Sequence, residues 1–308
     1  MTAQENARPE LKSLRVCSAD GAAADLLVAV PSTARIGVLW LPALGVGARH
    51  YEAFAAALAE QGVMIAVHEW RGAGSSDRRA SRACDWGYDK LLAEDIPASL
   101  AAAGEAHPDV RWIIAGHSLG GQLAALFAAL NPHSIAGFAF VASGSPYWRT
   151  FHGRMRRILR IVPWMVGLVT AICGYYPGKR LGFAGREART LMRDWARTAR
   201  TGRYQDTAEG RDSEQALAGY AQPLLGIRLS EDTLCPEASF RMVARQIPEC
   251  ADCAPVARPR GFFLRPGQSF FLVEGPATGC RAHGRMAAQL RLIQQMQDRN
   301  PRRSRESV

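Results

Sequence analysis

Short apolar runs alternate with stretches of helical periodicity along most of the chain. The run Ile36–Leu41 contains no polar residue, as expected of a strand buried on both faces of a parallel sheet. The same patterns predict further strands at 63–67, 112–115, 135–142, 223–229 and 269–273, and helices at 51–61, 91–103, 122–130, 237–247 and 287–296. Strands that alternate with helices indicate an α/β fold, in which a mostly parallel central sheet is flanked by helices.

The pattern changes at both ends of this alternation and once in its middle. Residues 14–17 and 26–30 flank Asp20 and Gly21, which predicts an antiparallel hairpin. Residues 146–215 combine aromatics, arginines and helical periodicity with no evident strand, so we expect an inserted helical cap. The predicted units are 1–145 and 216–298 for the two parts of the core, 146–215 for the cap, and 299–308 for an arginine-rich tail that we expect to be disordered.

Composition and charge narrow the class of protein. The 308 residues are 48% hydrophobic and 21% charged, which is ordinary for a globular protein, but the net charge is +10. Of the 38 basic and 28 acidic residues, 14 and 6 fall within 146–215, so eight of the ten net charges lie there. Because no nucleic-acid-binding motif accompanies this local excess, we expect no nucleic-acid partner. The alternatives are solvated arginines on a packed cap, or a lid whose basic side contacts anionic lipid.

Cysteine usage and targeting signals suggest a compartment. The N-terminus lacks the apolar segment of a secretory signal, and the longest apolar stretch, residues 161–173, is too short to span a bilayer. The seven scattered cysteines fit reduced thiols, so we expect a cytoplasmic protein. Cys250 and Cys253 form a C-x-x-C pair without a second pair or a histidine at zinc-binding spacing. We therefore expect neither a metal nor another cofactor.

The most specific chemical signal is the pentapeptide Gly-His-Ser-Leu-Gly at 116–120. An apolar strand precedes it and an Ala/Leu-rich helix follows it, which is the context of a nucleophile elbow. Such a turn holds its serine in a strained backbone conformation, and the glycines on either side allow the strand and the helix to approach closely. We expect Ser118 to be a catalytic nucleophile.

A serine nucleophile needs a base, an orienting acid and an oxyanion hole. In the expected chain order the acid follows a late strand, where Glu231 and Asp232 compete; Asp232 is preferred because Asp followed shortly by Pro is the commoner pattern at this turn. Of the seven histidines only His283 comes after Asp232, so it is the expected base. The backbone N–H groups of Leu119 and Leu44 are the expected oxyanion donors, on position alone.

The chain resembles the α/β-hydrolase superfamily in two segments. One is the 116–120 pentapeptide, and the other is Glu-Trp-Arg-Gly-Ala-Gly-Ser at 69–75, where the usual form is D-x-R-G-x-G-S and Glu69 replaces the Asp. More narrowly, residues 144–149, 174–183 and 193–197 are similar to a bacterial group of predicted, largely uncharacterised serine hydrolases. The resemblance implies an α/β-hydrolase fold and acyl-transfer chemistry, and it leaves the substrate open.

The C-terminal part departs from that group. Its base histidine lies in a stretch resembling Gly-His-x-Gly-Phe-Phe, whereas this chain has Arg-Gly-Phe-Phe at 260–263 with Pro259 at the histidine position. Either His283 supplies the base from elsewhere, or the segment 249–284 has diverged and the triad is incomplete; a shifted reading frame in that part of the gene would leave the same pattern. We expect a serine hydrolase that cleaves an ester or thioester, with an acyltransferase, a hydrolase of short peptides and a binding protein with a degenerate triad as alternatives.

Overall fold

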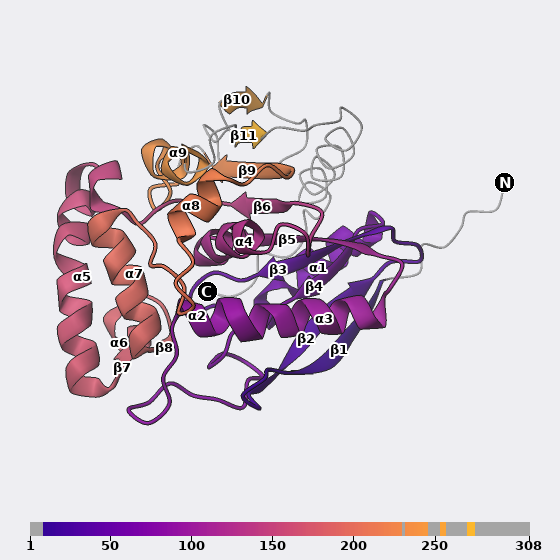
Figure 1. Cartoon of the computed structure of the whole chain (residues 1–308), viewed down its shortest axis with the longest axis horizontal. Helices are drawn as coiled ribbons and strands as arrows, with labels where there is room; N and C mark the ends of the chain where they lie inside the picture. Colours follow the sequence, from indigo (N-terminus) through magenta and orange to yellow (C-terminus); the bar gives the residue numbers. More distant parts are fainter. Residues whose placement is uncertain (1–8, 230–231, 246–252, 257–269, 275–308) are drawn as a thin grey trace, which may run out of the picture.

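A nine-stranded sheet runs through the computed structural model, which describes residues 9–229, 232–245, 253–256 and 270–274. Its strands lie in the order β1-β2-β4-β3-β5-β6-β9-β11-β10 (Figure 1). The central strands β4, β3, β5, β6 and β9 are parallel, and the strands at both edges are antiparallel. The bounds are β1 (Glu10–Cys17), β2 (Ala23–Val30), β3 (Ile36–Leu41), β4 (Met64–Val67), β5 (Arg111–His117), β6 (Phe138–Val141), β9 (Leu224–Leu229), β10 (Cys253–Val256) and β11 (Phe270–Glu274).

The expected α/β class is therefore confirmed, with two differences in detail. The strand predicted at 135–142 is shorter, because residues 132–137 still form the turn that leads into β6. The late strand predicted at 269–273 is present as β11, but it pairs antiparallel to β9. An apolar run indicates burial and not chain direction, so its sequence could not distinguish the two pairings. The predicted helix 287–296 and the tail 299–308 lie outside the described residues.

Helices cover both faces of the sheet, and the strands supply each face with alternate side chains. Leu39 and Leu41 of β3 belong to one apolar cluster, while Val38 and Trp40 belong to the cluster on the other face. The first cluster packs against α3 and α4, and the second against α1. The helical elements of the core are η1 (Ala48–Tyr51), α1 (Glu52–Glu60), α2 (Tyr88–Lys90), η2 (Leu91–Asp95), α3 (Ile96–Ala106), α4 (Leu119–Leu130), α8 (Ser213–Ala218) and α9 (Glu237–Arg245).

A separate group of elements is inserted between β6 and α8. It comprises η3 (Trp148–Thr150), α5 (Gly153–Cys173), β7 (Tyr175–Pro177), α6 (Gly178–Leu181), β8 (Arg186–Ala188) and α7 (Arg189–Thr201). Figure 1 shows α5 at the outer edge of the molecule, with α7 beside it. The expectation that this segment has no strand is wrong, because β7 and β8 form a short antiparallel pair. Strands of three residues are too short to produce a recognisable alternation in sequence. No helix in the described part of the chain has the length and apolar character needed to cross a membrane.

A buried ionic cluster connects the N-terminal hairpin to the core. The guanidinium of Arg71, from the loop after β4, makes two hydrogen bonds to Asp95 of η2, of 2.9 and 2.6 Å, and two to Asp20 in the β1–β2 turn. The side chains of Arg71 and Asp95 are almost fully buried. Hydrogen bonding from Arg71 holds the pKa of Asp20 well below its ordinary value. The cluster thus joins three segments that are distant in sequence.

His68 lies next to this cluster and makes stability depend on pH. Its Nδ1 is 2.8 Å from the Ser99 hydroxyl, its Nε2 has no hydrogen-bond partner among the described residues, and burial lowers its pKa from 6.5 to about 4. Between these two values the unfolded chain binds a proton that the folded chain does not, so stability falls as the pH falls from 6.5 to 4. We expect His68 to lower the free energy of unfolding by about 3 kcal/mol as the pH falls through that range.

Comparison with His68→Asn isolates this contribution. Urea unfolding of both proteins from pH 7 to pH 4 should show a difference in unfolding free energy that shifts in favour of His68→Asn as the pH falls. A difference that stays constant across this range would contradict the assignment.

Candidate active site

Ser118 lies in a sharp turn between β5 and α4. Its φ of 53° and ψ of −120° are rarely adopted by residues other than glycine, so the surrounding structure must hold the turn in place. The Ser118 N–H donates to the Val141 carbonyl at 3.1 Å, and the buried Ser143 hydroxyl donates to the Ser118 carbonyl at 2.6 Å. The strained conformation expected from the sequence is therefore present, and neighbouring β6 supports it.

Two glycines allow the elements around Ser118 to approach one another. A Cβ atom on Gly116 would overlap the backbone of Gly120, and one on Gly120 would overlap the carbonyl oxygens of Leu41 and Pro42. Helix α4 therefore begins directly against the end of β3 and the loop that follows it. This contact brings the first turn of α4 next to the loop that contains Leu44.

Both expected oxyanion donors have backbone N–H groups with no acceptor among the described residues. Leu119 is the first residue of α4, so its N–H has no partner within the helix and lies at the positive end of the helix dipole. The N–H of Leu44 likewise donates to no other described residue. Two such groups beside a serine hydroxyl could stabilise a negatively charged oxygen.

Three side chains hold the loop around Leu44. The Tyr51 hydroxyl accepts a hydrogen bond from the Ala43 N–H at 3.1 Å and lies 3.0 Å from Nδ1 of His117. Trp70 donates from Nε1 to the Pro42 carbonyl at 3.0 Å.

Glu69 supports the far end of this loop. Its carboxylate accepts hydrogen bonds from the N–H groups of Ala48 and Ser75, at distances of 3.1 and 3.3 Å. Sequence reasoning marked Glu69 and Trp70 only as part of a resemblance and missed Tyr51, which had no motif around it.

Removal of the Tyr51 hydroxyl should loosen the Leu44 loop. For Tyr51→Phe we expect kcat for an ester substrate to fall about tenfold with little change in KM, because a positioned donor contributes mainly in the transition state. The loss of a partly buried hydrogen bond should also lower the unfolding free energy by about 1 kcal/mol. Steady-state kinetics and urea unfolding measure the two effects. The matched control is Tyr220→Phe, because that hydroxyl is buried without a partner among the described residues; an equal loss of kcat in the control would contradict the role of Tyr51.

Asp232 follows β9, at the same end of the sheet as Ser118. Strand β6 lies between β5 and β9, and all three are parallel, so their carboxyl ends share one edge. The Asp232 carboxylate accepts hydrogen bonds from the N–H groups of Leu234 and Cys235 at 2.8 and 3.2 Å. Burial lowers the pKa of His117, while the negative charge of Asp232 acts in the opposite direction. Asp232 is therefore within electrostatic reach of the residue that precedes Ser118.

The remaining predicted site residues lie outside the part of the chain that the structure describes. These are the expected base His283, the competing acid Glu231, and the segment that contains Pro259 and residues 260–263. Cys250 of the C-x-x-C pair is also outside it. Leu119 thus follows Ser118 directly and lines the same cavity as Leu44, and Asp232 follows β9 at the same sheet edge, while the position of His283 stays a prediction.

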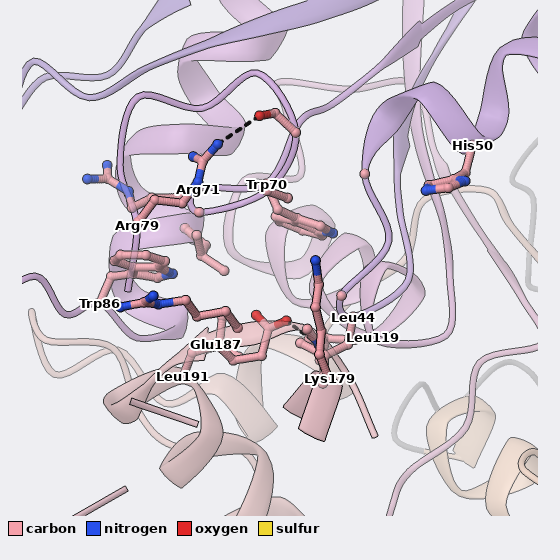
Figure 2. A pocket seen from close by; sticks show the side chains of 18 of the residues that line it. Leu44, His50, Trp70, Arg71, Arg79, Trp86, Leu119, Lys179, Glu187 and Leu191 are labelled. Carbon is pink, nitrogen blue, oxygen red and sulfur yellow. Dashed lines mark hydrogen bonds between the residues drawn. The ribbon is translucent and has the colours of Figure 1, made fainter. Parts of the chain in front are cut away.

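A cavity of about 610 Å³ opens beside Leu44 and Leu119. Figure 2 shows Trp70, Arg71 and Arg79 on one side and Leu119, Lys179, Glu187 and Leu191 on the other. The inserted segment therefore forms one wall, and it contacts the Leu44 loop directly: a Cβ on Gly45, whose φ is +77°, would collide with Ala184 and Gly185. The large apolar side chains of the lining are those of Leu44, Trp70, Trp86, Leu91, Leu119 and Leu191.

Glu187 contributes a buried carboxylate to this cavity. Its Oε1 accepts a hydrogen bond from the Gly185 N–H at 2.8 Å, and burial raises its pKa above the ordinary value. Arg49, Arg79 and Lys179 also line the cavity, so most of its charge is positive. The cavity can therefore accommodate a molecule with an apolar part and at least one charged or strongly polar group.

The fold and the site together define the class of protein. A largely parallel sheet with helices on both faces, a G-x-S-x-G turn after a central strand and a segment inserted after the next strand identify an α/β-hydrolase enzyme. Residues 34–250 match a family model described as serine aminopeptidase, S33, and the chain belongs to this family.

Solved structures support the fold. The α/β-hydrolase GrgF from Penicillium sp. sh18 is 15% identical over 78% of this chain and 87% of its own, with a TM-score of 0.55. The monoacylglycerol lipase of Paleococcus ferrophilus is 14% identical over 78% and 85%, with a TM-score of 0.50. The chain spans only about half of some other matches, such as 53% of the chain in the DcsB complex with its substrate analogue. At these identities the likeness concerns the fold alone. None of the curated proteins matches the chain.

Proposed function

We propose that this protein hydrolyses a carboxylic ester or thioester with Ser118 as the nucleophile. The observation that carries the proposal is the strained turn at Ser118, followed directly by Leu119, which lines a cavity of about 610 Å³ together with Leu44. A hydroxyl on such a turn can reach a bound acyl group, and the proposal is supported by the N–H groups of Leu119 and Leu44, which have no acceptor among the described residues and are available to an oxyanion.

The reaction follows the chemistry of a Ser-His-Asp triad. The Ser118 oxygen attacks the acyl carbon while its proton passes to His283, and the Leu119 and Leu44 N–H groups stabilise the oxyanion. When the bond to the leaving alcohol or thiol breaks, His283 returns the proton to it and an acyl-enzyme remains. Water then attacks the acyl carbon and gives a proton to His283. The bond between the acyl carbon and the Ser118 oxygen breaks, that oxygen takes the proton from His283, and the acid leaves. Asp232 orients His283 throughout. The role of His283 rests on chain order and that of Asp232 on its place after β9.

In this proposal residues 146–215 act as a cap over the substrate. Gly185, Glu187 and Leu191 from the insertion line the same cavity as Leu44 and Leu119 from the core. The apolar lining favours the acyl chain of the substrate, and the basic groups favour polar or anionic parts of it.

A fluorophosphonate probe tests the nucleophile independently of the substrate. We expect covalent labelling of Ser118, located by peptide mass spectrometry, and hydrolysis of p-nitrophenyl esters whose rate varies with acyl chain length. A probe that leaves Ser118 unmodified in folded protein would refute the proposal and favour a binding protein with a degenerate triad.

A second candidate is the hydrolysis of short peptides with a free N-terminus. The description of the family model names an aminopeptidase, and the Glu187 carboxylate faces the cavity, where it could pair with an ammonium group. Amino-acid p-nitroanilides separate the candidates. If they are the better substrates and Glu187→Gln raises their KM at least tenfold without affecting uncharged esters, the peptidase assignment holds; otherwise the esterase assignment stands.

A further inference from the structure

The outer face of α5 exposes a stripe of large apolar side chains. Buried residues of α5, such as Leu159, Pro163 and Val166, lie on its inner side, where the helix packs against α7. On the opposite side, five large side chains are between 49% and 66% exposed: Ile161, Trp164, Met165, Leu168 and Ile172. Including Leu181 and Phe183, the insertion carries seven of the nine large apolar side chains that are exposed in the described part of the chain. Scattered exposure would need no explanation, but a contiguous stripe does.

Basic residues continue the same stripe toward the N-terminus of α5. Arg157 precedes Ile161 by four positions and Arg154 by seven, so both lie on the exposed side of the helix. With Arg156 and Arg160, α5 carries four arginines and no acidic residue. None of the four is ion-paired within the described residues. Beyond the other end of α5, Lys179 and Arg180 are exposed next to Leu181. We call Arg154, Arg157, Ile161, Trp164, Met165, Leu168 and Ile172 the α5 face.

We propose that the α5 face docks on the surface of an anionic lipid bilayer. Apolar side chains flanked by unpaired cations match the boundary between acyl chains and phosphate headgroups. A second copy of this chain is a poorer occupant, because a parallel symmetric contact would bring the arginines of the two copies together, and an antiparallel one would place them against the apolar end of the partner's stripe. The cation Arg200 of α7 lies 4.5 Å from the centre of the Trp164 ring and adds positive charge beside the stripe.

Docking would bring one wall of the cavity near the lipid surface. Residues 179–191, which are separated from α5 only by a short segment that contains β7, include Lys179, Glu187 and Leu191 of that wall. This inference goes beyond the proposed hydrolysis and does not depend on it, because binding can be measured without turnover.

Vesicle sedimentation tests the proposal with the full chain. At low salt we expect the protein to sediment with phosphatidylcholine vesicles that contain about 30 mol% phosphatidylglycerol, at least tenfold more strongly than with phosphatidylcholine alone. Raising NaCl to about 0.5 M should weaken binding at least tenfold, because the charges are then screened. Trp164 should enter an apolar environment, so binding should shift tryptophan emission to shorter wavelength, and Trp164→Phe should reduce that shift.

Paired variants separate the two parts of the surface. Arg154→Gln with Arg157→Gln should weaken binding roughly 25-fold, since each basic side chain near the surface accounts for about fivefold. Leu168→Ser with Ile172→Ser should abolish the emission shift and weaken binding at least tenfold. The charge control is Arg35→Gln with Arg111→Gln, which removes the same charge from exposed positions at the N-terminal ends of β3 and β5. The apolar control is Leu11→Ser on the exposed side of β1. The controls should bind within about twofold of the wild type.

Three results would overturn the proposal. The first is absence of binding to the anionic vesicles at low salt by folded wild-type protein. The second is that both paired variants bind the anionic vesicles as strongly as the controls do. The third is that light scattering shows a dimer of the wild type and a monomer of Leu168→Ser with Ile172→Ser. A second copy of the chain would then occupy the α5 face.

Discussion

Replacing Ser118 with alanine is expected to lower kcat for a p-nitrophenyl ester by a factor on the order of 10⁴ to 10⁶. The hydroxyl oxygen forms the acyl-enzyme bond, so no neighbouring group can substitute for it in the same geometry. The two backbone donors and the cavity would remain, and residual activity above the rate in water would come from them. Alanine can keep the turn at φ 53°, so unfolding free energy should change by less than about 1 kcal/mol.

Kinetics and stability must be measured together for this variant. Circular dichroism and urea unfolding report whether the turn still forms, and the fluorophosphonate probe should no longer label the protein. Ser134→Ala is a suitable control, because this serine is exposed in the turn that precedes β6, whereas Ser118 is bonded to the other end of that strand. If Ser118→Ala retained more than about a tenth of wild-type kcat while folded, the nucleophile assignment would be wrong.

Replacing Arg71 with methionine should destabilise the fold by about 3–5 kcal/mol. The side chain of Arg71 is 5% exposed and that of Asp95 is 6% exposed, so the substitution would leave the Asp95 carboxylate buried without its cation. It would also remove the bonds that fasten Asp20, and with it the β1–β2 turn, to the core. Urea unfolding at neutral pH measures the loss as a lower midpoint.

An exposed ion pair and a double variant provide the comparison for Arg71. Arg15 pairs with Asp25 at 2.9 Å, but their side chains are 50% and 39% exposed, so Arg15→Met should lower the urea midpoint far less than Arg71→Met does. Adding Asp95→Asn to Arg71→Met removes the stranded charge and should recover part of the stability. Equal effects of Arg71→Met and Arg15→Met would show that burial does not control the strength of this cluster.

Much of the core could be predicted because each of its strands has a local signal. The run Ile36–Leu41 is apolar throughout, and the structure has β3 with the same bounds. The turn at Asp20 and Gly21 joins β1 and β2 as expected, with Gly21 at a φ of +78°. Helix α4 includes the whole predicted helix 122–130, although it begins three residues earlier, directly after Ser118. The direction of β11 and the short pair β7–β8 could not be predicted, because strand pairing depends on distant partners.

The candidate site likewise contains residues that the sequence could identify and residues that it could not. Ser118 could be found because its strained turn imposes glycines at fixed spacing on either side. Tyr51 and Glu187 carry no such signal: one supports the Leu44 loop through the Ala43 N–H, and the other reaches the cavity from an inserted strand. Their functions depend on contacts between segments that no local pattern describes.

The amino-acid sequence by itself determined the α/β class, the turn at Ser118 and the concentration of positive charge in residues 146–215, since periodicity, glycine spacing and charge are local properties of a chain. Only the tertiary structure decided which groups surround Ser118. It brings the Leu44 loop against the start of α4 and fastens that loop through Tyr51, Trp70 and Glu69. It also turns the apolar stripe of α5 outward, because the opposite side of the helix is used to pack against α7. Packing selects one arrangement among many that the same local patterns allow, and it does so through contacts between residues far apart in the chain.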